Sequence, residues 1–263
     1  MTITVAPTVD TANSPPRVRL DVTSSASETS ARVMRLDPDG VQRPVRTGDG
    51  NPLQLSVTGA TGTGLVYDYE VPYGAKVTYS TLESPGTVSA QVTVPEVRPW
   101  LIHPGVPARS MPVTFAADSF KEVTYGVSRG VFQPMGRRFP VVQTDGQRKA
   151  ATGSFIVQTA TLTELAALQA LVDDAGTLFL NVPTAAALGV PTGYVAIGDV
   201  KQVRLTDVGS NPIRNVVCDF MVVDQPVGGS QAQRTYADLL ANYTTYAALQ
   251  AAYPSYAAVL AGP

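Results

Sequence analysis

The residues of this sequence best suited to chemistry are its single histidine, its single cysteine and a few paired acids. A hydrolase of the Ser-His-Asp type needs an imidazole to take the nucleophile's proton, and only His103 could supply it. His103 lies in the apolar run Trp100–Gly105, just after a proline-rich segment, which favours packing of Trp100 and His103 at a domain junction. The sequence also lacks a Gly-x-Ser-x-Gly nucleophile turn. These residues predict a protein that is not an enzyme.

The sequence does not predict a metal or phosphate site either. Asp37–Gly40 has the composition of a hairpin turn and lacks the further spaced oxygen ligands of a calcium loop. Cys218 stands alone in an apolar run, which rules out an intramolecular disulfide and predicts a buried side chain. The glycine-rich Gly59–Gly64 is expected to be a loop, because no Lys-Ser/Thr follows it. We expect no cofactor and no metal.

Acids that are distant in a sequence can still meet in a fold, so spacing alone leaves paired-carboxylate chemistry open. The adjacent pair Asp173–Asp174 falls at the end of a predicted helix, where a solvated pair is expected.

The balance of charge limits the partners. The chain has 19 Lys and Arg against 21 Asp and Glu, and the nearest approach to a basic cluster is Arg137–Arg138. Nucleic-acid binding by counterion release needs clustered cations, so we expect none. No stretch approaches the roughly 20 apolar residues of a membrane span, and the N-terminus lacks the design of a signal peptide. We therefore expect synthesis in a cytoplasm and no membrane insertion.

Residues 1–96 are predicted to form an antiparallel β-sandwich, because short β-type runs alternate with clusters of Gly, Pro, Asn and Asp. Pro95–Pro99 is the expected linker to the next domain. The predicted strands of the sandwich are Val18–Val22, Arg32–Leu36, Val41–Arg46, Leu53–Val57, Leu65–Glu70, Lys76–Leu82 and Val88–Val94.

Residues 97–228 are predicted to form a second β domain with one helix at 162–174. Thr161 and Glu164 have the spacing of a capping box, and Gly176 follows the end of the helix. A turn is expected at Thr144–Gly146 and another at Gly209–Pro212. The predicted strands are Val113–Ala117, Glu122–Ser128, Val131–Phe132, Pro140–Thr144, Ser154–Thr159, Leu178–Val182, Tyr194–Thr206 and Asn215–Val223.

Residues 229–263 contain a repeat with a period of ten residues, and each repeat is expected to be a short helical piece. Thr235, Thr245 and Ser255 precede the repeat tyrosines as helix caps. Such short helices are marginal alone, so this arm needs a surface, either on its own second domain or on a neighbouring subunit. The predicted interface residues are Tyr236, Tyr243, Tyr246, Tyr253, Tyr256, Leu239 and Leu249.

Several stretches carry a family resemblance. They are Arg35–Gly40, Pro44–Arg46, Tyr67–Gly74, Phe132–Arg137, Pro140–Asp145, Pro226–Ser230 and the terminal tyrosine repeats. Together they resemble minor tail proteins of actinobacterial siphophages across nearly the whole chain. That family often carries Trp where the repeats here have Tyr236, Tyr246 and Tyr256. Pro72–Tyr79 is also similar to the end of a fibronectin type III module, and the second domain resembles the split-barrel domain of tail-tube and distal tail proteins.

The resemblance implies a structural subunit of a virion tail, a distal or minor tail protein located near the tail tip. It implies contacts with tail-tube, tape-measure and tail-tip or baseplate subunits, and assembly as a homo-oligomeric ring, a hexamer in the proteins it resembles. An alternative is a carbohydrate-binding module for attachment to the host. Tyr67, Tyr69, Tyr73 and Tyr79 could stack on sugar rings, although the alternation of Tyr67 and Tyr69 is equally expected in a sandwich core.

Overall fold

The computed structural model describes most of the chain and is mainly β, as predicted, with several antiparallel sheets and two short helices. The described residues are 2–12, 15–25, 28–47, 52–83, 90–96, 98–184, 188–190, 192–205, 211–226, 245 and 248–250.

The chain divides into two compact units, and it passes between them four times. The first unit contains Met1–Pro112, Leu178–Thr192 and Pro226–Pro263, and the second contains Val113–Thr177 and Gly193–Gln225. The limits of these units differ from the predicted domain boundaries at residues 96 and 228. The difference arises because Trp100–Ile102 pairs with a strand some 80 residues later, which a local sequence pattern does not reveal.

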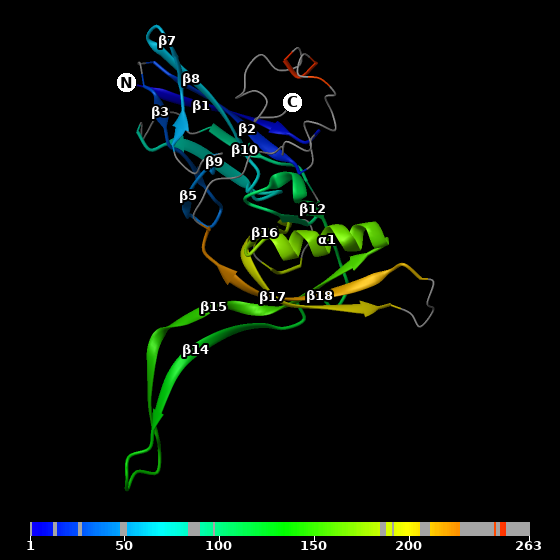
Figure 1. The fold of residues 1–263 in the computed structure, drawn as a ribbon. Coiled ribbons are helices and arrows are strands. Elements are labelled where there is room, and N and C mark those ends of the chain that lie inside the picture. Colours follow the sequence, from blue (N-terminus) through cyan, green and yellow to red (C-terminus); the bar gives the residue numbers. More distant parts are fainter. Residues whose placement is uncertain are drawn as a thin grey trace. The chain divides into compact units, whose positions relative to one another are not determined.

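Two four-stranded antiparallel sheets make up most of the first unit (Figure 1). One has the order β1 (Ile3–Asp10), β2 (Arg17–Ser24), β8 (Thr61–Asp68), β7 (Ser56–Thr58). The other has the order β10 (Ala90–Thr93), β9 (Lys76–Thr81), β4 (Val33–Leu36), β5 (Gln42–Pro44). A short pair, β3 (Ser30–Ala31) and β6 (Leu53–Gln54), accompanies them.

Alternating apolar residues form these strands and their core. In β2, Val18, Leu20 and Val22 are buried while Arg19 and Thr23 are exposed, which is the two-residue period of a sheet with one covered face. β1 is absent from the predicted strands, because its central proline interrupts the pattern. As an edge strand β1 tolerates that proline, which removes one donor.

The glycine-rich segment is only partly a loop. Gly59 turns the chain with a φ of +65°. β8 already begins at Thr61, so the predicted loop at Gly59–Gly64 is wrong from Thr61 onward. An added Cβ would lie 2.7 Å from the Glu28 carbonyl oxygen at Gly62 and 2.7 Å from Leu55 Cδ2 at Gly64. The glycines therefore permit close packing of this strand.

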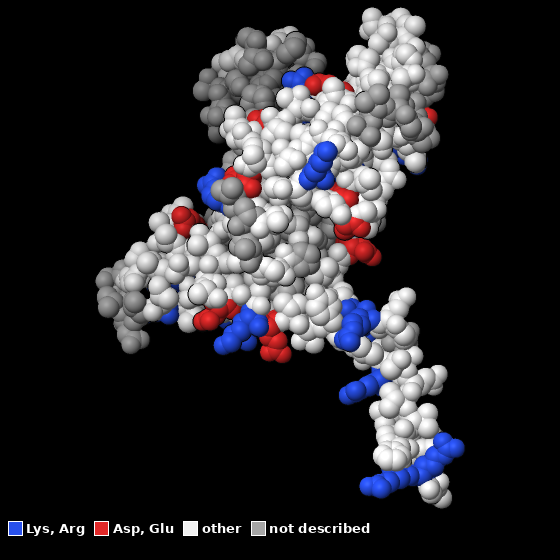
Figure 2. Space-filling model, turned by 180° about the vertical axis from the view of Figure 1, so that it is seen from behind, with Lys and Arg blue, Asp and Glu red and all other residues white. Residues whose placement is uncertain are grey.

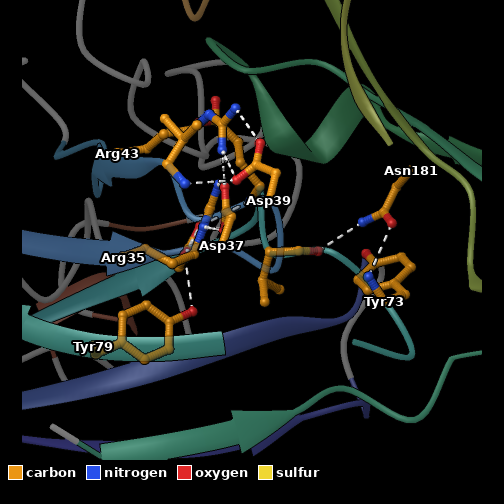
Figure 3. Close-up of polar contacts among 11 residues, drawn as sticks. Arg35, Asp37, Asp39, Arg43, Tyr73, Tyr79 and Asn181 are labelled. Carbon is orange, nitrogen blue, oxygen red and sulfur yellow. Dashed lines mark hydrogen bonds and ion pairs between the residues drawn. The ribbon is translucent and has the colours of Figure 1, made fainter. Parts of the chain in front are cut away.

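A buried ionic network fixes the second sheet of this unit (Figure 3). The Arg35 guanidinium donates to Asp37 at 2.5 Å and to both carboxylate oxygens of Asp68 at 2.8 and 2.9 Å. The Tyr79 hydroxyl donates to Asp68 at 2.9 Å, and Arg43 donates to Asp37 at 2.6 Å. Each buried charge thus has a charged partner, as burial of ions requires.

The predicted turn at Asp37–Gly40 is confirmed. The Gly40 N–H donates to the Asp37 carbonyl at 3.0 Å, and Gly40 has the positive φ expected of the turn. Its carboxylates bind cationic side chains: Asp37 binds Arg35 and Arg43, and Asp39 binds Arg43 at 2.8 Å. The carboxylates of the turn therefore hold the side chains of Arg35 and Arg43 in place.

The first unit also contains a small sheet in the order β12 (Met111–Pro112), β11 (Trp100–Ile102), β16 (Leu178–Asn181), with a 3₁₀ turn at Pro107–Arg109. Asn181 ties this sheet to the segment before β9 (Figure 3). Its side chain accepts from the Tyr73 N–H at 3.0 Å and donates to the Val71 carbonyl at 2.7 Å. One fully buried amide therefore satisfies two buried backbone groups.

The second unit is a sheet with the order β17 (Gly193–Arg204), β18 (Arg214–Val223), β15 (Val141–Thr159), β13 (Thr114–Phe115), and β14 (Val123–Phe132) pairs with β15. Its core contains a cluster of rings 5.0 to 5.8 Å apart, formed by Phe115, Phe120, Phe155 and Phe220. Cys218 is buried beside them, as predicted, and burial raises the pKa of its thiol to about 12.

The predicted helix at 162–174 is confirmed as α1 (Leu162–Asp174). Thr161 caps it by accepting from the Glu164 N–H at 3.1 Å, and the Glu164 carboxylate accepts from the Ala160 N–H at 2.7 Å. Three buried leucines at helical spacing form its inner face: Leu165, Leu168 and Leu171.

Replacing Asn181 by leucine would leave the Tyr73 N–H and the Val71 carbonyl buried without partners. We expect Asn181→Leu to lower the free energy of unfolding of the first unit by about 2 to 5 kcal/mol. Trp100, the only tryptophan, lies on the neighbouring strand β11 and reports unfolding by its fluorescence in urea. Gln91→Leu, at an exposed position of β10, is the matched control. A loss no larger than that of the control would contradict this account.

Candidate interaction surface

The dominant feature of the second unit is a long hairpin formed by β14 and β15 (Figure 1). Its pairing runs from Val123 and Gly153 out to Phe132 and Val141. β15 also pairs with β18, but only from Thr152 onward. Among the described strands, the outer part of the hairpin therefore has no third strand beside it.

The hairpin is longer than the sequence indicates. The predicted turn at Thr144–Gly146 is wrong, because β15 continues through these residues as a strand of 19 residues. Register shifts lie on either side of Val127, and Gly146 has a φ of +78° in the partner strand. Such irregularities accommodate a turn-forming sequence within a ladder and bend the strand locally. The predicted pieces Glu122–Ser128 and Val131–Phe132 likewise form one strand, β14.

A tight turn closes the end of the hairpin. The Arg137 N–H donates to the Pro134 carbonyl at 3.2 Å, and Gly136 has a φ of +79°, as a type II turn requires at its third position. The Gln133 side chain donates to the Arg137 carbonyl at 2.7 Å. This turn holds Met135 at its apex.

We call Val131–Val142 the hairpin tip. Its large apolar side chains are exposed to an extent that is unusual for a folded chain. The exposed fractions are 62% for Val131, 68% for Phe132, 97% for Met135, 74% for Phe139 and 52% for Val142. Several large exposed apolar side chains on one short element are typical of a surface that contacts another molecule.

The charged side chains described on the hairpin are all cationic: Arg129, Arg137, Arg138, Arg148 and Lys149. The sequence adds a single acid to this stretch at position 145. On the face seen in Figure 2 the projecting ribbon shows Lys and Arg without Asp or Glu. The Arg138 guanidinium lies 5.7 Å from the Phe139 ring centroid, so charge and apolar surface are interleaved. The tip thus suits a partner that is apolar and acidic.

Other kinds of site find less support in the described part of the chain. Among those residues no group of three or more His, Cys, Asp or Glu is placed to hold a metal ion. None of the described helices has the length and apolar character that a membrane crossing requires.

No protein-family model and no curated protein matches this sequence.

Trp100 and His103 lie at one end of the small sheet of the first unit. Trp100 is buried in β11, and His103 follows that strand. The Nδ1 atom of His103 accepts from the N–H groups of Gly105 at 3.0 Å and Val106 at 2.9 Å. A nitrogen that accepts two backbone hydrogen bonds holds a turn, which agrees with a structural role for this histidine.

The predicted arm lies mostly outside the described residues, which include neither its five tyrosines nor Leu239. The exceptions are Thr245 and residues 248–250. The Ala248 N–H donates to the Thr245 hydroxyl at 3.2 Å, so the predicted helix cap at Thr245 is confirmed. Leu249 follows in helical conformation and is half-buried.

The tyrosines considered for sugar binding are mostly inside the first unit. Tyr73 and Tyr79 are almost fully buried, and Tyr69 is 8% exposed. One face of the Tyr67 ring is covered by the Arg17 guanidinium, 4.0 Å from the ring centroid. Arg17 also donates to the Tyr69 hydroxyl at 2.7 Å. Tyr69, Tyr73 and Tyr79 are parts of a core and offer no open platform for a sugar ring, whereas Tyr67 is half-buried.

Sequence reasoning missed the hairpin tip. Phe132, Met135 and Phe139 occur in a stretch rich in Gly, Pro and Arg, and their type alone predicts burial. The available signal was the combination of Arg137–Arg138 with aromatic residues on both sides. It indicates an interaction surface only once these side chains are known to be exposed.

Burial raises the pKa of Tyr69 to about 12, and it also raises the pKa values of Tyr73 and Tyr79. In the unfolded chain tyrosines ionise near pH 10. The folded state thus binds more protons above pH 10, so its stability is fully present below that pH and falls as pH rises from about 10 through 12. Absorbance at 295 nm should show these three rings protonated at pH 11 until the chain unfolds. Their ionisation together with the solvated tyrosines would contradict this burial.

Proposed function

We propose that this chain is a non-enzymatic structural subunit of a bacteriophage tail, a distal or minor tail protein, and that it assembles through protein–protein contacts. The observation that carries the proposal is the hairpin tip, which presents Phe132, Met135 and Phe139 to solvent on a two-stranded ribbon. An isolated ribbon of two strands is marginally stable in water, so a partner surface that covers it stabilises its conformation.

The strand order of the first unit supports the fibronectin type III-like part of the proposal. Immunoglobulin-like sandwiches place their first, second, fifth and fourth strands in one sheet and the third, sixth and seventh in the other. Here β1, β2, β8 and β7 form one sheet, and β4, β9 and β10 lie together in the other with β5 at its edge. A module of this kind suits a decoration on the outside of a tail.

The second unit supports the split-barrel, distal-tail-like part. It has few strands, one helix on the sheet, and a hairpin that extends well past the sheet (Figure 1). A projecting element on one subunit that docks on a different surface of the next makes a head-to-tail contact, which forms a ring where the rotation between subunits closes. A homo-oligomeric ring is therefore the assembly we propose, with other tail proteins as its neighbours.

The alternative function, carbohydrate binding, gains little from these side chains, because Tyr69, Tyr73 and Tyr79 are buried and Arg17 covers one face of the half-buried Tyr67 ring. Nor does the neutral overall balance of charge favour a nucleic-acid partner. Assembly remains the function that the exposed surface supports best.

The test is the solution mass of the full chain by light scattering over a range of concentrations. We expect an oligomer that dissociates when Met135 and Phe139 are both changed to serine. Each side chain is already exposed in the single chain, so the dissociated variant should stay folded, as its circular dichroism would show. If both side chains are buried on assembly, each contributes about 1.5 to 3 kcal/mol, or at least tenfold in the dissociation concentration.

Leu82→Ser is the matched control, since Leu82 is a 50% exposed apolar residue of the first unit. It should leave the oligomer intact. A wild-type chain that stays monomeric at high concentration, or a tip variant that assembles as the wild type does, would count against the proposal.

A further inference from the structure

The helix α1 has an outer face that no described residue covers. Leu162, Ala166 and Ala170 follow one another at four-residue intervals on the side opposite the buried leucines, and all three are exposed. Leu162 is 57% exposed. Asp173 and Asp174 are exposed at the end of the same face. We call these five residues the acidic helix face.

The charges of α1 are unbalanced. The helix carries Glu164, Asp173 and Asp174 and has no basic residue in its last turn. Glu164 is engaged by the Ala160 N–H at the start of the helix. The two aspartates sit at the end where the helix dipole is negative, so they disfavour the helix rather than stabilise it. Asp173 is exposed in this last turn, where a cation from another molecule would offset the repulsion.

The hairpin tip has the complementary composition. Phe139 and Met135 supply apolar surface, and Arg137 and Arg138 supply guanidinium groups that pair with carboxylates through two parallel hydrogen bonds. Alanines on the helix face leave room for large rings to lie against the backbone. Within one chain the two surfaces do not cover each other, because Phe139 is 74% and Leu162 57% exposed.

We propose that the hairpin tip of one copy of this chain docks on the acidic helix face of a second copy. Phe139 and Met135 then pack on Leu162, Ala166 and Ala170, and Arg137 and Arg138 lie beside Asp173 and Asp174. The inference rests on the proposed function and names the partner surface of the same hairpin. Each copy donates one tip and offers one helix face, so the contact propagates from subunit to subunit.

Charge reversal on the two surfaces tests this pairing in the full chain. The tip variant is Arg137→Glu with Arg138→Glu, and the helix variant is Asp173→Lys with Asp174→Lys. Lysines at this end of α1 suit the helix dipole, so a loss of assembly by the helix variant does not come from melting of the helix. Each variant alone brings like charges together and should raise the dissociation concentration on the order of a hundredfold.

Mixing the two variants is the decisive step. The glutamates of one variant's tip then meet the lysines of the other's helix, and the arginines of the second tip meet the aspartates of the first helix. Both contacts are complementary in an alternating assembly, so light scattering should show oligomers restored at a 1:1 ratio. A matched double reversal in the first unit, Lys76→Glu with Arg98→Glu at exposed positions, should assemble as the wild type does.

The outcomes separate this inference from the proposed function. If the tip variant fails to assemble while the helix variant assembles normally, the acceptor is not α1, and the hairpin still mediates assembly. If both variants fail and their mixture stays monomeric, the pairing of tip and helix is overturned. If neither variant loses assembly, the pairing is overturned as well. A monomer whose tip binds phosphatidylserine vesicles would overturn it in favour of a membrane partner.

Discussion

A β-ribbon of two strands completes the hydrogen bonds between its own strands but leaves both faces and both outer edges without cover, and this constraint governs the second unit. Near the sheet, β18 pairs with β15 and so covers one outer edge of the ribbon that β14 and β15 form. From Thr152 toward the tip no described strand lies beside them, and the exposed side chains there include Val, Phe and Met as well as Arg. A sequence that only needed solubility would place polar residues at these positions. The apolar tip therefore has its physical rationale in a second molecule.

The first unit follows a different design, because it buries charged side chains in pairs. Arg35, Asp37 and Asp68 are all nearly inaccessible, yet their charges are paired and their hydrogen bonds satisfied. Replacing one member would leave an unpaired buried charge, which costs far more than the pair itself contributes. Asn181 adds a second polar tie at a separate position. Such ties specify one arrangement of strands, which suits a rigid module more than a binding site that must adapt.

Local patterns in the sequence predicted the elements that are determined locally. Thr161, Glu164 and the leucine spacing gave α1 its bounds, and the composition of Asp37–Gly40 gave the turn. The same local chemistry misled at Thr144–Gly146, because long-range pairing with β14 absorbs a turn sequence as an irregularity in the strand. Burial of the first unit's tyrosines and exposure of the tip were beyond reach for a related reason. Whether an aromatic residue is covered depends on which strands lie beside it, and that is a property of the whole fold.

The cations of the hairpin limit contacts between its own exposed apolar ribbon and an identical one. Unpaired strand edges invite indiscriminate pairing, and charged side chains along the edges oppose it by mutual repulsion between identical ribbons. Arg129, Arg148 and Lys149 flank the apolar tip in this way, so two tips repel each other. The same charges attract an acidic surface, which disfavours contact between two tips and favours contact with a different surface, as in the proposed assembly. Repulsion between like elements and attraction between unlike ones favour a head-to-tail contact, and such a contact can repeat around a ring.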